Sequence, residues 1–126
     1  MRININRNNL LDIINIKFNV FNPINSFMSK ENIISVIENL SLSNNDFFPL
    51  PIFFDIDSDC FKNAKKSSFL KIFFNDIKIC DLYIESIYEL KSKKKLGIKL
   101  FNTKDEKHPG FNNFLKSGKF FVQGKV

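Results

Sequence analysis

Residues 69–84 carry the most constraining pattern in this chain, an alternation of apolar side chains interrupted by a single Asn-Asp pair. The alternating apolar positions are Leu70, Ile72, Phe74, Ile77 and Ile79. A period of two places every second side chain on one face of a strand, and Asn75-Asp76 is a pair that favours a tight turn. The pattern predicts a β-hairpin over residues 69–84 with a less regular extension to Tyr88, and it places Ile72 on the core face.

Two segments before this hairpin have helical spacing. Residues 8–17 predict a short amphipathic helix opened by an asparagine cap. Its expected apolar positions are Leu10, Leu11 and Ile14. Ser29 is a good N-cap for a second helix, and Glu31 in its first turn suits the helix dipole. The expected apolar face of this helix is Ile33, Ile34, Ile37 and Leu40, and residues 18–28, with Pro23, predict a loop between the two helices.

The rest of the chain favours short strands. An apolar run predicts a strand from Ile52 to Ile56, entered through two prolines, and the polar residues 58–68 predict a loop or helical turn. Ile98 and Leu100 alternate as a strand would, and residues 119–126 predict a final strand.

A short helix is expected between these last two strands. Pro109 would occupy its first position, Leu115 would end it, and Gly118 would stop the chain from continuing as a helix. Two or three helices with five or six short strands give an α+β domain with a small, strongly curved sheet or barrel.

Length and composition bound the possible classes of protein. With 126 residues the chain is expected to form one domain, residues 1–126. No apolar run approaches the ~20 residues of a membrane helix, and the polar start does not suit a signal peptide, so a soluble cytoplasmic protein without a membrane partner is expected. Cys60 and Cys80 have no metal-ligand spacing and are expected to be reduced, partly buried thiols.

Few residues offer metal, phosphate or nucleophilic chemistry. His108 is the single histidine, and with two separated cysteines it cannot complete a tetrahedral metal site. No phosphate-binding glycine loop and no G-x-S-x-G segment is present. Asp55, Asp57 and Asp59 alternate as ligands of a divalent ion would, but a polar strand end explains them better.

Nucleic acid is a second class of partner that the composition raises. The net charge of +6 suits a polyanion, and it equally suits a solvated lysine-rich surface. GKFFVQGKV, residues 118–126, interleaves lysines with Phe120 and Phe121, as a stacking platform would, but a terminal core strand explains it better. The cluster Lys91–Lys95 is favoured as part of a solvated loop.

Five collinear segments resemble one family, sulfate adenylyltransferase (ATP sulfurylase). FNPINSFM at 21–28 is similar to the family's F-x-P-L-x-G-F-M, and FFPLPIFFDID at 47–57 is similar to W-P-I-P followed by an apolar run and D-V. YIESIYE at 83–89 is similar to V-x-x-I-Y-x-P-D-K, and LFNTKDEKHPGF at 100–111 is similar to V-F-G-T-x-D-P-x-H-P-G-V. GKFFVQGKV at 118–126 is similar to G-x-Y-Y-V-G-G-K. Together they cover about residues 10–126. Each motif alone is weak, whereas five in order with fitting spacing are specific.

This chain departs from the family pattern at several positions. Ser26 and Asn102 replace glycines, Glu106 replaces a proline, and Leu90 and Lys91 stand where Pro-Asp occurs. Asn102 is expected to keep its turn, because asparagine tolerates a positive φ better than most residues.

The resemblance implies a PUA-like β pseudo-barrel with short flanking helices, the N-terminal domain of that enzyme. The family's catalytic motifs, Q-x-R-N-P-x-H-x-x-H and G-R-D-H-A-G, belong to a separate domain, and neither occurs here. The implied parent reaction joins ATP and sulfate to give adenosine 5′-phosphosulfate and pyrophosphate, with Mg²⁺. This chain is therefore expected to bind no cofactor or metal itself and to be inactive alone.

The resemblance also assigns roles and partners. Asp105 and His108 are expected to order a loop, and Pro109 and Gly110 to shape the entry of the following helix, so that no residue is catalytic. The expected partner is the catalytic domain in cis or trans, with a homo-oligomer left open. The alternative is a stand-alone PUA-like nucleic-acid-binding module, because that fold also hosts RNA binders and the chain is basic.

Overall fold

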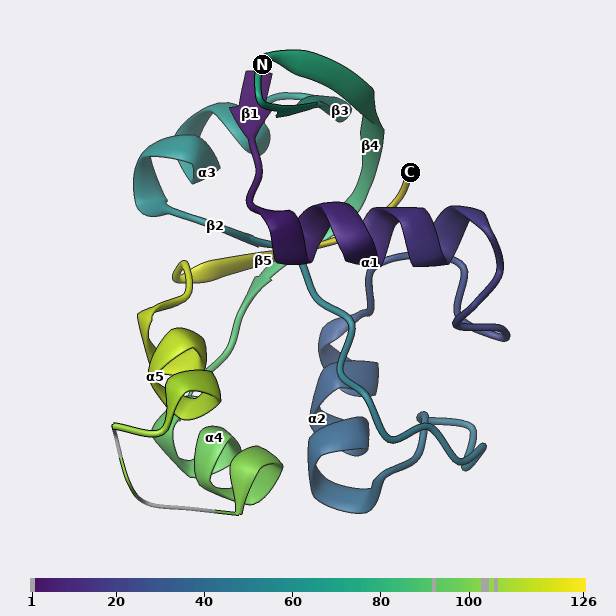
Figure 1. The fold of residues 1–126 in the computed structure, drawn as a ribbon, viewed down its shortest axis with the longest axis vertical. Coiled ribbons are helices and arrows are strands. Elements are labelled where there is room, and N and C mark those ends of the chain that lie inside the picture. Colours follow the sequence, from purple (N-terminus) through teal and green to yellow (C-terminus); the bar gives the residue numbers. More distant parts are fainter. Residues whose placement is uncertain (1, 92, 103–104, 106) are drawn as a thin grey trace.

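A computed structural model describes residues 2–91, 93–102, 105 and 107–126, which form a curled sheet and a set of short helices (Figure 1). The strands are β1 (Arg2–Asn4), β2 (Asp55–Ile56), β3 (Phe69–Phe74), β4 (Ile77–Glu89) and β5 (Phe120–Lys125). The helices are α1 (Arg7–Lys17), α2 (Lys30–Asn39), α3 (Ser58–Ala64), α4 (Lys93–Phe101) and α5 (Pro109–Lys116). The expected α+β class with a strongly curved sheet is confirmed.

The strands form one sheet in the order β1-β3-β4-β5-β2. β1 runs parallel to β3, and every other neighbouring pair is antiparallel. The sheet curls so that β1, β2 and β3 gather above α1, while α2, α4 and α5 lie below it (Figure 1). In this strand order β5, the last strand in the sequence, is an inner strand, and β1 and β2 are the two edge strands of the sheet.

The predicted hairpin is confirmed. β3 pairs with the first half of β4, and the turn residues Asn75 and Asp76 have φ values of 49° and 65°. Two successive positive φ values are those of the type I′ turn that matches the twist of a hairpin. Ile72 has no exposed surface, as expected. β4 continues past Tyr88 to Glu89 because its second half pairs with β5.

The second predicted helix is confirmed as α2. The Ser29 hydroxyl accepts a hydrogen bond from the Asn32 amide at 3.2 Å, which caps the helix as expected. Ile33, Val36 and Ile37 are buried in the core. Leu40 was expected on this apolar face, but it ends the helix with φ 55° and is 51% exposed. A left-handed residue turns its side chain away from the helix face that precedes it.

The helix predicted over residues 8–17 is confirmed as α1, but its predicted apolar face is largely wrong, because of Leu10, Leu11 and Ile14 only Leu10 is partly buried. The helix begins at Arg7 behind the cap Asn6, and it buries Ile13 and Ile16, whereas Leu11 and Ile14 are 45% and 40% exposed. Apolar residues occupy both sides of this helix, so its own sequence does not specify which side faces the sheet.

The predicted strand through Ile98 and Leu100 is also wrong, because the residues form α4. Lysine and leucine are good helix formers, and Leu96 and Leu100 lie one turn apart on the same side. Leu96 is buried, and α4 packs against α2 and α5. A strand period of two and a helix period of 3.6 cannot be distinguished over so few apolar positions.

In three further segments the observed bounds of the helices and strands differ from the predicted ones. The strand predicted over Ile52–Ile56 is shortened to β2, and residues 58–68 contain the helix α3, capped by the Asp57 carboxylate. α5 begins at Pro109 as predicted and continues to Lys116, one residue beyond the expected end.

The core is rich in phenylalanine. Phe27, Phe54 and Phe121 are almost completely buried, and the rings of Phe27 and Phe54 lie 5.3 Å apart. The Phe27 amide also donates to the Gly124 carbonyl at 2.9 Å, which joins the early loop to β5. Cys60 and Cys80 are half-buried thiols that are not joined in a disulfide, as expected. Among the described residues, every helix is too short and too polar to cross a membrane.

Candidate functional site

The segment around the single histidine forms the turn that leads into α5. The Asp105 carboxylate accepts a hydrogen bond from the Lys107 amide at 2.9 Å, and the Asp105 carbonyl accepts one from the His108 amide at 3.0 Å. The His108 carbonyl then accepts from the Asn112 amide at 2.9 Å, within the first turn of the helix. The imidazole lies 5.5 Å from the Phe101 ring. A role of Asp105 and His108 in ordering the loop remains a prediction.

The helix entry is packed closely against the end of α4. A Cβ atom on Gly110 would lie 2.6 Å from the Phe101 ring, so glycine permits this approach. Pro109 occupies the first helical position. Asn102 keeps a positive φ of 52°, as expected for a residue that replaces glycine. Glu106, the position where the family has proline, lies outside the described residues.

One lysine of the predicted basic cluster has a buried structural contact. The Lys93 ammonium group donates to the Ser117 carbonyl at 3.0 Å and to the Ser117 hydroxyl at 2.6 Å. Burial lowers the pKa of Lys93, and the nearby Asp55 carboxylate opposes this shift. A cation at the last carbonyl groups of a helix is favourable, so Lys93 stabilises the end of α5. Lys94 and Lys95 are exposed.

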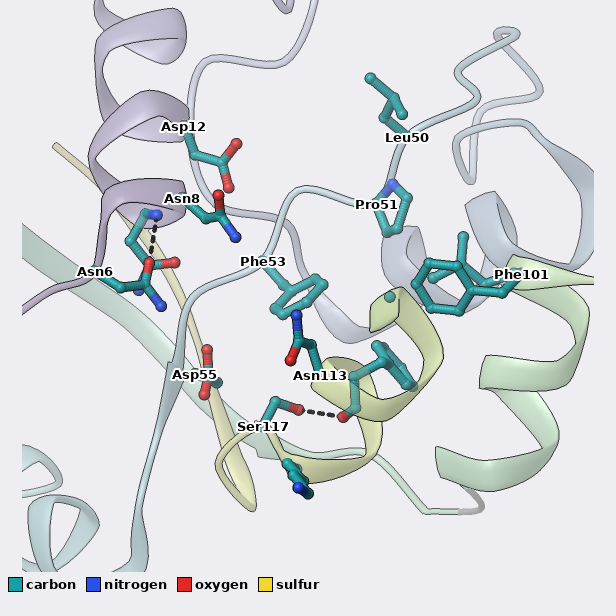
Figure 2. A pocket seen from close by; sticks show the side chains of 15 residues that line it. Asn6, Asn8, Asp12, Leu50, Pro51, Phe53, Asp55, Phe101, Asn113 and Ser117 are labelled. Carbon is teal, nitrogen blue, oxygen red and sulfur yellow. Dashed lines mark hydrogen bonds between the residues drawn. The ribbon is translucent and has the colours of Figure 1, made fainter. Parts of the chain in front are cut away.

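A hollow of about 650 Å³ lies between α1 and α5 (Figure 2). Its polar wall comes from the start of α1, its apolar wall from residues 50–53 and the end of α4, and its remaining side from α5. Figure 2 shows side chains from these segments facing the same space: Asn8, Asp12, Pro51, Phe53 and Asn113.

A second hollow of about 410 Å³ lies between the two edge strands of the sheet. It is lined by residues 3–5 of β1 and its exit, and by residues 54–57 of β2 and its flanks. Both hollows share Asn6, Asn9, Asp55 and Lys116, so they form one continuous groove. We refer to the two hollows together as the groove.

The side chains that line the groove carry a net negative charge, whereas the whole chain carries a net positive charge. Three carboxylates, from Asp12, Asp55 and Asp57, face it against one lysine, Lys116, although the chain carries a net charge of +6. Burial raises the pKa of Asp12 from 3.8 to about 6. The Asp55 carboxylate accepts from the Gly118 amide at 2.7 Å, and Asp57 accepts from the Cys60 amide at 2.7 Å.

The aspartates and phenylalanines that raised the questions of metal and RNA binding have structural contacts. Among the described residues no group of three histidine, cysteine, aspartate or glutamate side chains lies close enough to hold a metal ion, and Asp57 is used as a helix cap. Phe121 and Val122 are fully buried, and the Phe120 ring packs at a tilt of 56° against the Phe61 ring with centroids 3.9 Å apart, which confirms core packing for the final strand.

Sequence reasoning missed the groove and Asp12. The groove is built from segments 3–12, 50–57, 100–101 and 110–118, which are mostly distant in the chain. One signal was present: Asp12 is a lone carboxylate inside the apolar helical run LLDII. An acid in such a run either faces solvent or is partly buried with a raised pKa.

Comparison with known proteins identifies the family. The PUA-like domain family matches residues 1–126. The chain belongs to this family. The PUA-like domain is 26% identical over 125 residues to the sulfate adenylyltransferase of Pyrococcus abyssi, covering 99% of this chain and 32% of that relative. It is 31% identical over 130 residues to the enzyme of Entamoeba histolytica, covering 99% of this chain and 31% of the relative.

A third relative has the same relation to the PUA-like domain. The sulfate adenylyltransferase of Ignicoccus hospitalis is 30% identical over 115 residues, covering 91% of this chain and 30% of the relative. The chain spans about a third of the length of the curated relatives it matches. The recognition made from the sequence, a PUA-like N-terminal domain of sulfate adenylyltransferase, is confirmed.

Proposed function

We propose that this PUA-like domain is a non-catalytic part of a sulfate adenylyltransferase and supports the catalytic domain of that enzyme, in cis or in trans. The observation that carries the proposal is the similarity to sulfate adenylyltransferases over 99% of this chain but only about a third of their length. The reaction of ATP with sulfate, its Mg²⁺ and its place in cytoplasmic sulfate assimilation would then belong to the assembled enzyme.

The use of the charged side chains supports a non-catalytic role. Nucleotidyl transfer depends on cations and donors that are positioned around the phosphates. Lys93 is engaged with Ser117, while Lys99 and Lys119 lie 3.5 Å from the carboxylates of Glu38 and Glu89. The single histidine packs beside Phe101 at the entry of α5. These groups are spread over separate elements and do not converge on one phosphate-sized space.

The outer face of α1 is the surface we propose for contact with the catalytic domain. Leu11, Ile14 and Phe18 lie at positions i, i+3 and i+7, on one side of the helix, and the side chain of Phe18 follows the helix end and is 78% exposed. The opposite side of the helix already packs into the core through Ile13 and Ile16. An apolar stripe of this kind gains stability when a partner covers it, and relatives of this domain carry about twice its length in further chain.

A pyrophosphate-release assay with Mg²⁺, ATP and sulfate tests the absence of catalysis. The purified domain and its His108→Ala variant should both give no sulfate-dependent turnover. Turnover by the wild type that disappears in a correctly folded His108→Ala variant would overturn the proposal and make His108 catalytic.

A chimera tests the supporting role. The domain replaces the matching third of the Entamoeba histolytica enzyme, and the chimera is compared with a deletion of that third. We expect the chimera to be soluble and to turn over at least tenfold faster than the deletion, on the order of the loss when catalytic groups are misplaced. A chimera no better than the deletion would contradict the supporting role.

The proposed contact surface has its own matched variants within that chimera. Leu11→Ser with Phe18→Ser should lower its activity or solubility, whereas Ile77→Ser with Tyr83→Ser, exposed on the hairpin, should not. If both pairs of substitutions lowered activity or solubility equally, the catalytic domain would contact a surface other than the outer face of α1.

Nucleic-acid binding is the competing function, and the net charge of +6 is the observation that favours it. Binding to single-stranded RNA that is strong at ~50 mM salt and weakens steeply with added salt would support it. Absence of binding at that salt concentration would remove it.

A further inference from the structure

The two edges of the sheet face each other across the second hollow without pairing. In the described part of the chain β1 pairs with β3 alone and β2 with β5 alone, and residues of both strands line the same space. A curled sheet whose two edges do not pair with each other leaves a space between them, here the hollow of about 410 Å³. We call the space between β1 and β2 the gap.

Backbone groups of both edges point into the gap. The Phe54 carbonyl accepts from the Val122 amide at 2.9 Å, so the main chain of Phe54 faces β5 and that of Asp55 faces away from it. The Ile5 amide donates to the Phe73 carbonyl at 2.9 Å, so the main chain of Asn4 faces away from β3. Unpaired N–H and C=O groups along a strand edge are a template for another extended chain.

The gap has an apolar floor, and its rim carries two carboxylates, Asp55 and Asp57, against one lysine, Lys116. Phe54 and Ile56 are buried beneath it, and Ile3 and Ile5 are partly buried against the same core. Their neighbours along each strand, Asn4, Asp55 and Asp57, have side chains on the alternate face. A strand that entered the gap would place every second side chain over the floor and the others beside these carboxylates.

We propose that the gap binds an extended segment of a partner polypeptide that carries lysine or arginine at alternate positions. β1 and β2 run in opposite directions through the connected sheet, so the bound segment is parallel to one edge and antiparallel to the other. Because the edge strands have three and two residues, about four residues of the partner would pair. The acidic rim of an otherwise basic domain selects a basic segment.

Amide exchange and chemical shifts measured by NMR test the proposal with a defined probe, the peptide acetyl-Lys-Val-Lys-Val-Lys-Val-Lys-amide. In the free domain the amides of Asn4 and Asp55 should exchange quickly, because they have no strand partner, and those of Ile5 and Ile56 slowly, because both face a paired strand. Adding the peptide should shift the resonances of Asn4, Asp55 and Asp57 and slow the exchange of Asn4 and Asp55.

Two control peptides separate backbone pairing from charge. The same peptide with glutamate in place of lysine should bind at least tenfold more weakly, because unfavourable charge contacts with the two carboxylates Asp55 and Asp57 replace favourable ones. The lysine peptide with N-methyl groups on its valines cannot complete the ladder and should also bind at least tenfold more weakly. Equal binding of either control would overturn the proposal.

Isosteric variants test the rim without removing its structural hydrogen bonds. Asp55→Asn with Asp57→Asn keeps an acceptor for the Gly118 amide and a good helix cap, and should weaken the lysine peptide about 3- to 10-fold at low salt. Asp46→Asn with Glu85→Gln removes two exposed charges that do not line the groove, and should change binding less than twofold. If both pairs of substitutions weakened peptide binding to a similar extent, the peptide would be attracted by the net charge of the domain and not by the rim of the gap.

Three further outcomes would also overturn the proposal. The first is that the lysine peptide does not bind, and the second is that its resonance shifts lie only on surfaces outside the gap. The third is that, without any peptide, the amide exchange of Asn4 and Asp55 becomes slower as the concentration of the domain is raised. The last outcome would assign the gap to a second copy of this chain.

Discussion

At the scale of single residues, Asp12 makes stability depend on pH. Burial raises its pKa to about 6 in the folded domain, above the value of 3.8 that an exposed aspartate has. Between these values the folded state holds a proton that the unfolded state releases, so stability falls as the pH rises from about 4 to 6. The site is partly open to solvent, which reduces the effect to about 1 kcal/mol.

Asp12→Asn should remove this dependence. Urea unfolding is expected to show the variant about 1 kcal/mol more stable than the wild type at pH 7.5, with the advantage shrinking towards pH 4. An advantage that stayed constant with pH, or a loss of stability at pH 7.5, would show that the Asp12 carboxylate is well solvated or held by a favourable contact.

Leu40 is a second residue whose replacement should stabilise the domain. A left-handed φ costs a residue with a Cβ atom roughly 1–2 kcal/mol, and the half-exposed side chain of Leu40 contributes little packing in return. Leu40→Gly should raise the free energy of unfolding by about 0.5–1 kcal/mol, after the greater flexibility of glycine in the unfolded chain is subtracted. Leu40→Ala keeps the unfavourable φ and serves as the control. If both variants changed the urea midpoint alike, backbone strain would not be the cause.

At the scale of elements, β3 is an inner strand of the sheet and pairs with β1 and β4. Ile72 has no exposed surface, and truncating a fully buried isoleucine to alanine costs roughly 2–5 kcal/mol. Ile72→Ala should lose that amount in urea unfolding, while Ile77→Ala at the exposed turn should lose less than about 0.5 kcal/mol. A loss below about 0.5 kcal/mol for Ile72→Ala would mean that the inner face of β3 is not well packed.

The same elements show what the sequence could predict. The β3–β4 hairpin and α2 were predicted because long periodic patterns and local turn or cap residues agree there. α4 was predicted as a strand because two apolar positions fit either period, and only packing against α2 and α5 decides between them. β1 is three residues long and exists through pairing with residues 71–73, which no local pattern encodes. The groove was missed for the same reason, since four separate segments of the chain build it.

At the scale of the whole molecule, the domain depends on its last strand. β5 pairs with both β4 and β2 and supplies Phe121 and Val122, neither of which has exposed surface. A version ending at Gly118 should therefore lack the far-ultraviolet circular dichroism and dispersed amide resonances of the folded domain. Removing Val126 alone should leave both intact. A folded protein ending at Gly118 would show that the helices and the hairpin form a stable core without β5.

The inner position of β5 has a consequence for biosynthesis. A ribosome releases β2, β3 and β4 well before residues 120–125, and domains generally complete their folding only when the required chain has emerged. During that interval the nascent chain presents β4 with one vacant edge and leaves Phe27 without its contact to Gly124. Translation speed and chaperone access while the codons for residues 90–126 are read would then govern the yield of folded domain more strongly than any event during synthesis of residues 1–63.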